Sequence, residues 1–342
     1  MPDLRPLLNL TSDHLRALPL LVLSITDGCN SRCLTCDIWK NPRRNMPLPF
    51  VARLVGEFAA LGGRAVALTG GEAMQHPQWA EIAALFRRAG VKVGLITNGL
   101  FLKKDANAVI AHVDSLTVSL DGAAPETYAA IRGVDAFALV LEGMAMVAAG
   151  GVSITTRTTV QRANFTEIPA IIDAALGAGA ARASFLPVDV LNTEAFGVRT
   201  FPADPIHSPA LQADDLPVFA ALLDALEGTH AAEFAAGQIA ESPAKLRRLW
   251  DYFAAPFGLA SFAPPRCNAP HLSLVVEVDG RIRPCYFLPT GGDLRQTPLS
   301  AALNNPALVA LRSAYRRGQR PECTRCVCPL HRGARALITG AI

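Results

Sequence analysis

The chain has 342 residues, with 32 lysines and arginines against 29 aspartates and glutamates and a formal net charge of +3. This length is about twice that of a typical domain, so we expect one large body and a smaller module. No run of lysine and arginine is dense enough for a nucleic-acid footprint, and no apolar stretch near the start is long enough to span a bilayer. We therefore expect a cytoplasmic protein without a nucleic-acid or membrane partner.

From Leu20 to about Leu186, short runs rich in Val, Ile and Leu alternate with longer amphipathic stretches. This pattern is typical of repeated βα units. It predicts strands at 20–26, 65–69, 93–97, 115–120, 153–160 and 183–187, and helices at 50–62, 79–90, 104–113, 137–150 and 165–179. Six units are fewer than the eight of a closed barrel, so we expect an α/β fold with an open, partial (β/α)6 barrel.

Composition divides the chain into three parts. We assign residues 1–205 to the barrel, the Ala-rich residues 206–260 to a helical connector, and residues 261–342 to a C-terminal cysteine-rich domain. Within the last part, residues 271–285 read as a hairpin with Asp279 and Gly280 at its tight turn.

The eight cysteines are grouped at short spacings, which favours metal ligation in a reducing compartment over a disulfide framework. The first group, Cys29, Cys33 and Cys36 in CNSRCLTC, supplies only three thiolates. A cubane cluster has four irons, so one iron is left without a protein ligand. Just as a catalytic zinc keeps one open position, this vacancy predicts a site where a small molecule binds metal directly.

Other distinctive residues follow the predicted strands, at the end of a parallel sheet where chemistry gathers. Gly70, Gly71 and Glu72 follow the second strand, Thr97 and Asn98 the third, and Ser119 and Asp121 the fourth. Each has a structural alternative: an acid in the first turn of a helix for Glu72, and turn or capping chemistry for the rest. Their shared location favours one common site.

The order and placement of these motifs resemble the radical S-adenosylmethionine (SAM) superfamily. CNSRCLTC corresponds to its C-x3-C-x2-C motif and LTGGE to its GGE motif, and TNG and VSLDG match recurrent strand-end elements. The resemblance implies that Cys29, Cys33 and Cys36 hold a 4Fe-4S cluster whose fourth iron takes the amino and carboxylate groups of SAM. It also implies an external electron donor of the flavodoxin or ferredoxin type.

By the same resemblance, Gly70, Gly71 and Glu72 receive the methionine amino group, while Thr97, Asn98, Ser119 and Asp121 lie near the cofactor. Leu186, at the end of the sixth strand, either lines the adenine pocket or belongs to the core. Many family members have an aromatic residue just before the third cysteine, where this chain has Thr35. Ile38 or Trp39 is then the candidate for packing on the adenine.

The second cysteine group comprises Cys267, Cys285, Cys323, Cys326 and Cys328. Four cysteines can bind one zinc ion. Beside the first motif, however, C-x12-G-x4-C followed by C-x2-C resembles the twitch domain, a shortened relative of the SPASM domain. That resemblance implies that Cys267, Cys285, Cys323 and Cys326 hold one auxiliary 4Fe-4S cluster, the second in the chain. Cys328 is a spectator, a replacement for Cys326, or a hydrogen donor to a substrate radical.

The implied reaction begins with cleavage of SAM to a 5'-deoxyadenosyl radical, which removes hydrogen from a substrate. Our leading hypothesis is oxidation or epimerisation of a small polar metabolite, because the cluster layout resembles that of 2-deoxy-scyllo-inosamine dehydrogenase. The first alternative is maturation of a ribosomally made peptide by crosslinking or thioether formation. The second is an iron-sulfur scaffold without activity.

Four residues are candidates for the substrate pocket: Asp189, Asn192 and Glu194 in PVDVLNTEAFG, and Tyr286 beside Cys285. The carboxylates of Asp189 and Glu194 suit a catalytic role in orienting an amine or taking a hydroxyl proton, although both residues also suit a solvated loop. His76 and His331 are interpreted as local structural groups.

Overall fold

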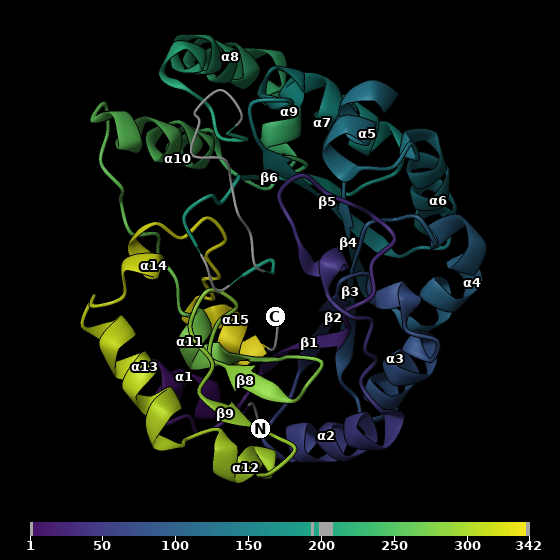
Figure 1. The fold of residues 1–342 in the computed structure, drawn as a ribbon, viewed down its shortest axis with the longest axis vertical. Coiled ribbons are helices and arrows are strands. Elements are labelled where there is room, and N and C mark those ends of the chain that lie inside the picture. Colours follow the sequence, from purple (N-terminus) through teal and green to yellow (C-terminus); the bar gives the residue numbers. More distant parts are fainter. Residues whose placement is uncertain (1–2, 193–194, 198–207, 340–342) are drawn as a thin grey trace.

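The computed structural model describes residues 3–192, 195–197 and 208–339. Its strands form one sheet in the order β6-β5-β4-β3-β2-β1-β7-β8-β9 (Figure 1). The first six pair in parallel with their neighbours: β1 (Leu20–Thr26), β2 (Ala65–Gly70), β3 (Lys92–Thr97), β4 (Ser115–Ser119), β5 (Ser153–Val160) and β6 (Arg182–Pro187). The sheet is not closed, so the prediction of an open six-unit barrel is confirmed.

Helices follow these strands and cover the outside of the curved sheet (Figure 1). The predicted helices are present as α2 (Leu48–Ala60), α3 (Trp79–Arg88), α4 (Leu102–His112), α6 (Phe137–Ala149) and α7 (Ile168–Gly177). The sequence interpretation missed α5 (Pro125–Arg132), although proline begins this helix and Gly133 ends it in the left-handed region, with φ of +67°. Both are ordinary signals of a short helix.

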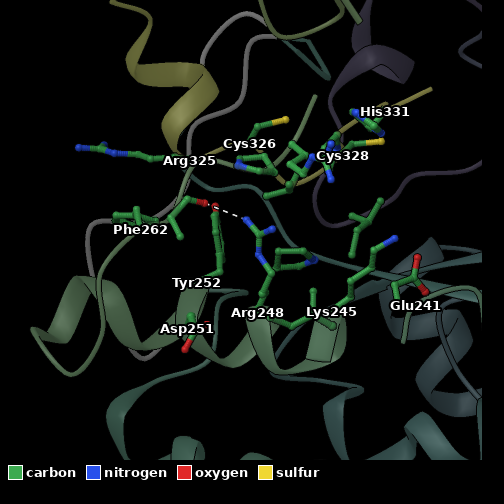
Figure 2. A pocket seen from close by; sticks show the side chains of 18 of the residues that line it. Glu241, Lys245, Arg248, Asp251, Tyr252, Phe262, Arg325, Cys326, Cys328 and His331 are labelled. Carbon is green, nitrogen blue, oxygen red and sulfur yellow. Dashed lines mark hydrogen bonds between the residues drawn. The ribbon is translucent and has the colours of Figure 1, made fainter. Parts of the chain in front are cut away.

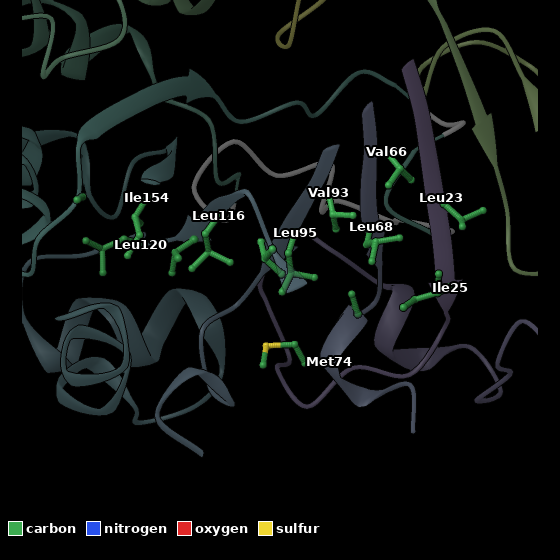
Figure 3. Packing of buried hydrophobic residues seen from close by; sticks show 14 of the residues in the cluster. Leu23, Ile25, Val66, Leu68, Met74, Val93, Leu95, Leu116, Leu120 and Ile154 are labelled. Carbon is green, nitrogen blue, oxygen red and sulfur yellow. The ribbon is translucent and has the colours of Figure 1, made fainter. Parts of the chain in front are cut away.

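Apolar and more polar side chains alternate along the strands, which gives the barrel an apolar outer layer and a more polar interior. Leu23, Ile25, Leu68, Leu95 and Leu116 are almost fully buried and point toward the surrounding helices (Figure 3). Successive strand residues point to opposite faces. Thr69, Ile96, Ser119 and Arg157 therefore face the barrel interior, where functional groups can converge.

The C-terminal segment extends the same sheet. β7 (Ser273–Val276) pairs in parallel with β1, and β8 (Arg281–Arg283) and β9 (Gly292–Asp293) follow as antiparallel strands. The predicted hairpin is confirmed, with Gly280 at φ of +84° in its turn. The second cysteine group is therefore attached beside β1, the strand that leads into the first.

Further helices lie in the connector segment and toward both ends of the chain. The segment predicted as a helical connector contains α8 (Leu216–Thr229), α9 (Ala231–Ala235) and α10 (Pro243–Ala254). The remaining helices are α1 (Arg5–Asn9), α11 (Ala269–Leu272), α12 (Leu299–Ala302), α13 (Pro306–Arg316), α14 (Pro321–Thr324) and α15 (Ala334–Thr339). Within the described ranges, no helix combines the length and apolar character needed to cross a membrane.

The outer edge of β6 is occupied by the connector. The N–H of Ala183 donates to the Gln238 carbonyl at 2.8 Å, and the Ala183 carbonyl accepts from Ala240 at 2.9 Å. The N–H of Phe185 donates to the Glu241 carboxylate at 2.9 Å, and Pro187 has no N–H. Consequently, the amides of β6 that face away from β5 are either bonded or missing, so an added strand would find no free N–H donor on this edge.

Candidate active site

The first three cysteines lie in the loop after β1, half-buried and unoxidised. Burial raises the pKa of each thiol, and burial together with the charges of Cys33 and Cys29 raises that of Cys36 to about 12. The backbone amides of Ser31 and Ile38 hydrogen-bond the sulfurs of Cys29 and Cys36. Mutually close thiols with N–H donors to sulfur fit the ligand set of an iron-sulfur cluster, which stabilises them as thiolates.

Helix α5 holds this loop in place. The Arg32 N–H donates to the Arg132 carbonyl at 3.0 Å, and the Leu34 N–H donates to the Ile131 carbonyl at 2.9 Å. A Cβ at Gly133 would lie 2.5 Å from the Arg32 carbonyl oxygen, so only glycine allows this approach. The last turn of α5 thus provides acceptors for two amides of the cysteine loop.

The two glycines of the GGE motif bring the end of β2 against the same loop. A Cβ at Gly70 would lie 2.2 Å from the Thr26 carbonyl oxygen, and one at Gly71 would lie 2.4 Å from that of Gly28. The N–H groups of Gly71 and Glu72 donate to these carbonyls at 2.8 and 2.7 Å. The glycines are therefore required for packing between two strand ends, as well as being available for close approach of a ligand.

Glu72 joins the ends of β2 and β3. Its Oε1 accepts from the Thr97 hydroxyl at 2.8 Å and the Met74 N–H at 3.0 Å, and its Oε2 accepts from the Asn98 N–H at 2.7 Å. The residue is 1% exposed, and burial raises the pKa of its carboxyl while these hydrogen bonds oppose the rise. A carboxylate has about four acceptor positions, so one remains on Oε2 for the ammonium group of a ligand.

The predicted residues at the third and fourth strand ends have separate roles. Thr97 bonds Glu72, and the Asn98 side chain donates to Asn30 and Ser31 in the cysteine loop. Ser119 is half-buried at the end of β4, opposite Arg157 of β5 in the sheet register. Asp121 is buried and bonded within the protein, which places it behind the cysteines as a support.

Asp121 forms a buried ion pair with Arg132 at 3.0 Å, and its other oxygen accepts from the Thr159 N–H at 2.6 Å. Burial raises the pKa of the Asp121 carboxyl, an effect that Arg132 opposes. The guanidinium also lowers the pKa of the neighbouring Cys33 thiol against the effect of burial. Sequence reasoning missed Arg132 because it missed α5.

The five C-terminal cysteines converge. Burial raises the pKa of Cys285 to about 12 and that of Cys323 to about 11, and charges on nearby members of the group contribute. Backbone amides also serve these sulfurs: the Ala269 N–H donates to Cys267 Sγ at 3.5 Å, and the Phe287 N–H bonds Cys285. Cys328 is the exposed member, and its sulfur lies 3.9 Å from the Arg157 guanidinium.

Among the described residues, no three His, Cys, Asp or Glu side chains are placed to hold a single metal ion. In a cubane each thiolate binds a different iron, so the ligands stand farther apart than those around a single ion. The convergence and the N–H donors in both cysteine groups are the features that fit iron-sulfur ligation.

Tyr286 lies between the two cysteine groups. It follows Cys285 in the chain, and burial together with the nearby Cys36 raises the pKa of its phenol. Its hydroxyl oxygen accepts from the Phe196 N–H at 3.4 Å, while the Phe196 carbonyl accepts from Asp37 in the first loop at 2.9 Å. A short path of packed residues therefore connects both sites.

Two cavities open near these groups. One, of about 510 Å³, lies between the ends of β1 and β2 and the β7–β8 hairpin, and Ile38 and Tyr286 line it. Glu277 and Arg283, which form an ion pair at 3.0 Å, also line it and were missed from sequence. The other, of about 570 Å³, lies beside β5, β6 and α10 and is lined by Leu186 and Cys328.

The remaining predicted residues are placed as follows. Oδ1 of the buried Asp189 accepts from the Leu191 and Asn192 amides at 2.9 Å each, and the residue lines neither cavity. The Asn192 side chain donates to the Phe287 carbonyl at 3.2 Å. Glu194 lies outside the described residues.

Trp39, a candidate for packing on the adenine, is half-buried under Lys40. The Lys40 side-chain nitrogen is 5.3 Å from the centroid of the Trp39 ring.

The two histidines differ in setting. His76 is buried and hydrogen-bonded to Met46 and Gln78, as a structural group would be. His331 is exposed at the rim of the larger cavity.

An open barrel with three loop thiols, a glycine-glycine-glutamate turn and a second cysteine centre defines a class of iron-sulfur enzymes. Comparison with known families agrees: the Radical SAM superfamily matches residues 23–175, and the SPASM iron-sulfur cluster-binding domain matches residues 267–327. The chain belongs to the radical SAM superfamily and carries a SPASM domain.

Curated relatives resemble parts of the chain. The AdoMet-dependent heme synthase of Methanosarcina barkeri is 32% identical over 175 residues, which is 49% of this chain and 50% of the relative. The GTP 3',8-cyclase of Aeromonas hydrophila is 37% identical over 143 residues, covering 38% of this chain and 42% of the relative. The chain thus spans about half or less of these proteins.

Solved structures share the fold over most of the chain. SuiB of Streptococcus suis bound to S-adenosylmethionine covers 94% of this chain and 74% of its own, with a TM-score of 0.64 and 13% identity. The structure of anSMEcpe with bound AdoMet covers 91% of this chain and 88% of its own, with a TM-score of 0.65 and 16% identity. At these identities the likeness shows the fold alone.

Proposed function

We propose that this enzyme removes a hydrogen atom from a small polar substrate and oxidises it, with SAM as the radical source and two 4Fe-4S clusters. When bound at Cys29, Cys33 and Cys36, the cluster and SAM supply a 5'-deoxyadenosyl radical, which abstracts hydrogen from carbon. Glu72 holds the ammonium group of SAM through its remaining acceptor position. Thr97 and Asn98 keep the Glu72 carboxylate oriented, and the buried site keeps water from the radical.

The observation that carries this proposal is the position of Tyr286. It adjoins Cys285 of the auxiliary group and lies within electrostatic reach of Cys36. A substrate held between the two groups can lose hydrogen on one side and an electron on the other. An auxiliary cluster with four protein thiolates has no open iron, so electron acceptance is its simplest role.

Such a path favours oxidation over epimerisation. For a secondary alcohol, loss of the carbon-bound hydrogen atom, one electron and the hydroxyl proton leaves a ketone. Epimerisation would instead need a hydrogen atom returned to carbon, and Cys328 is the exposed thiol available for that step. Oxidation is therefore the reaction that we propose first. Epimerisation would be favoured if product formation required Cys328 but did not require the auxiliary cluster.

The test uses anaerobically reconstituted protein reduced by dithionite or by a flavodoxin. Formation of 5'-deoxyadenosine without substrate tests radical generation, and none from fully loaded protein would favour an inactive scaffold. Polyols and aminocyclitols deuterated at carbon should then transfer deuterium into 5'-deoxyadenosine and yield one carbonyl product per turnover. Deuterium transfer without any oxidised product would contradict the proposed outcome.

Peptide maturation is the second candidate. It is favoured by the shared fold with SuiB, for which a structure bound to the precursor peptide SuiA covers 88% of this chain. The two candidates differ in the origin of the abstracted hydrogen. A deuterated peptide that labels 5'-deoxyadenosine while the small alcohols do not would favour peptide maturation.

A further inference from the structure

The larger cavity has a strongly basic lining. It occupies about 570 Å³ beside β5, β6, α10 and the segment 324–332 that carries the last cysteines (Figure 2). Its cationic residues come from four parts of the chain: Arg157, Lys245, Arg248, Arg266, Arg325 and Arg332. Two acidic residues line the same cavity, Glu241 and Asp251.

Neither acid forms an ion pair with these cations, and six cations against two acids leave the lining with a net positive charge. The Glu241 carboxylate accepts from the Ser184 hydroxyl at 2.7 Å and the Phe185 N–H at 2.9 Å, so it is committed to the edge of β6. Asp251 points away from Arg248 in Figure 2. In the described ranges, no ion pair within 4.0 Å joins either acid to a cation of this cavity.

The cations are likewise left without anionic partners in the described part of the chain. The Arg248 guanidinium donates to the Ala263 carbonyl at 2.9 Å, and Arg325 stacks on Phe262 at 5.4 Å from the ring centroid. Nε of Arg157 and Nε of Arg332 are buried with no hydrogen-bond partner. Six cations with unused donors create a positive potential, which selects a ligand of opposite charge.

We propose that this cavity binds the anionic part of a small substrate, namely a phosphate or carboxylate compound carrying at least two negative charges. The inference rests on the proposed function, because it takes this anion to belong to the molecule that loses hydrogen. Arg157 connects the two sites: its guanidinium lies 3.9 Å from Cys328 Sγ, and its backbone pairs in register with Ser119. An anion held here anchors a substrate between the strand ends and the auxiliary cysteines.

A small molecule fits this cavity better than an extended peptide. Peptides commonly bind beside a sheet by adding a strand to its edge. At β6 that edge is already used, because Ala183 pairs with Gln238 and Ala240 while Phe185 is bonded to Glu241. A ligand here is therefore held mainly by side chains, and most of the charged side chains in the lining are cationic.

The test measures binding of inorganic pyrophosphate and of citrate to reconstituted protein by calorimetry, at constant ionic strength. Saturating SAM is present, so that the SAM site is already filled and the measured heat does not come from anions that bind in place of the SAM carboxylate. The variants Lys245→Gln and Arg248→Gln each remove one cation of the cavity. Arg247→Gln is the matched control, because Arg247 lies on the same helix but pairs with Asp224 and Glu227.

We expect each cavity variant to weaken binding roughly tenfold, with unchanged melting temperature and unchanged binding by Arg247→Gln. Preference for pyrophosphate identifies a phosphate compound, and preference for citrate identifies a carboxylate compound; both support the proposal. Absence of binding, or equal weakening by Arg247→Gln, overturns it. Binding of a hexaglutamate peptide more tightly than either small anion also overturns it, in favour of an acidic peptide.

Failure of this inference is distinguishable from failure of the proposed function. Uncoupled formation of 5'-deoxyadenosine is measured on the same samples. If it occurs while neither anion binds, the anion site alone is wrong. If anions bind as expected but no 5'-deoxyadenosine forms, the radical function is wrong and the cavity remains an anion site.

Discussion

The Arg132 guanidinium lies 3.0 Å from the Asp121 carboxylate, and both side chains are buried beside Cys33. This ion pair lies close to a thiol that the family resemblance assigns to the cluster. A charge at this position would act at short range on a cluster bound there, because the surrounding medium has a low dielectric constant and screens the field poorly. We therefore expect the Asp121–Arg132 pair to influence the reduction potential of a cluster held by the first three cysteines.

Breaking the pair from either side should move the reduction potential of the first cluster in opposite directions. Asp121→Asn leaves Arg132 uncompensated and should raise the potential, whereas Arg132→Met removes the cation and should lower it, each by on the order of 50 mV. Potentiometric titration followed by electron paramagnetic resonance measures both shifts. Arg88→Met, which removes an exposed cation at the end of α3, is the control. Shifts of the same sign in the two variants would contradict this electrostatic role.

The barrel strands and most helices could be predicted because their apolar residues recur at clear periods. Leu21, Leu23 and Ile25 alternate in β1 as the pattern requires, and all three are fully buried. The thiols and the GGE turn were identifiable for a different reason, since their spacing is rare by chance. Local sequence carries both kinds of information.

What could not be predicted depends on contacts between distant segments. The pairing of β7 with β1 joins residues about 250 positions apart, and no local pattern specifies such a partner. The basic cavity gathers Arg157, Lys245 and Arg325 from three separate segments. The Asp189 carboxylate, which is a candidate for the substrate pocket, accepts from two amides of its own loop, and its residue type alone did not indicate these contacts. Helix α5 was predictable from its proline and glycine and was overlooked.

Glu72→Gln should weaken both the hydrogen bonds that connect the ends of β2 and β3 and the binding of SAM. An amide at this position presents N–H where the protein already supplies donors from Thr97, Met74 and Asn98. We expect a loss of about 1–3 kcal/mol in unfolding free energy and weaker SAM binding by calorimetry. Glu81→Gln changes an exposed acid in α3 and is the control. Unchanged stability would show that the carboxylate is not the structural joint described here.

Replacing cysteines of the first group and of the second group should impair different steps of the reaction. Replacing Cys29, Cys33 and Cys36 together with Ala should abolish SAM cleavage, whereas Cys323→Ala should retain some cleavage and lose the oxidised product. Iron analysis of the wild type should give about eight atoms per chain for two cubanes. Four irons with bound zinc would overturn the auxiliary cluster. Comparing Cys326→Ala with Cys328→Ala identifies the fourth ligand, because only the ligand variant should lose iron.

His271 should make the protein less stable in acid. The residue is 5% exposed, and the guanidinium of Arg316 lies 3.0 Å from Nε2, which accepts a hydrogen bond only when the ring is neutral. Burial, together with Arg316 and Arg312, lowers the pKa of His271 from 6.5 to about 4, although Asp13 opposes the shift.

At pH values between these two pKa values, His271 is protonated in the unfolded chain and neutral in the folded chain. The free energy of unfolding therefore falls as the pH drops from about 6.5 toward 4. Allowing for solvent screening, the loss is on the order of 1–3 kcal/mol. Thermal melts at pH 7.5, 6.0 and 5.0 should show a smaller decrease for His271→Gln than for the wild type, because glutamine does not titrate. His14→Gln, which replaces an exposed histidine, should retain the wild-type slope. Equal slopes for His271→Gln and the wild type would mean that His271 does not titrate with folding, and acid sensitivity would then have to arise elsewhere in the chain.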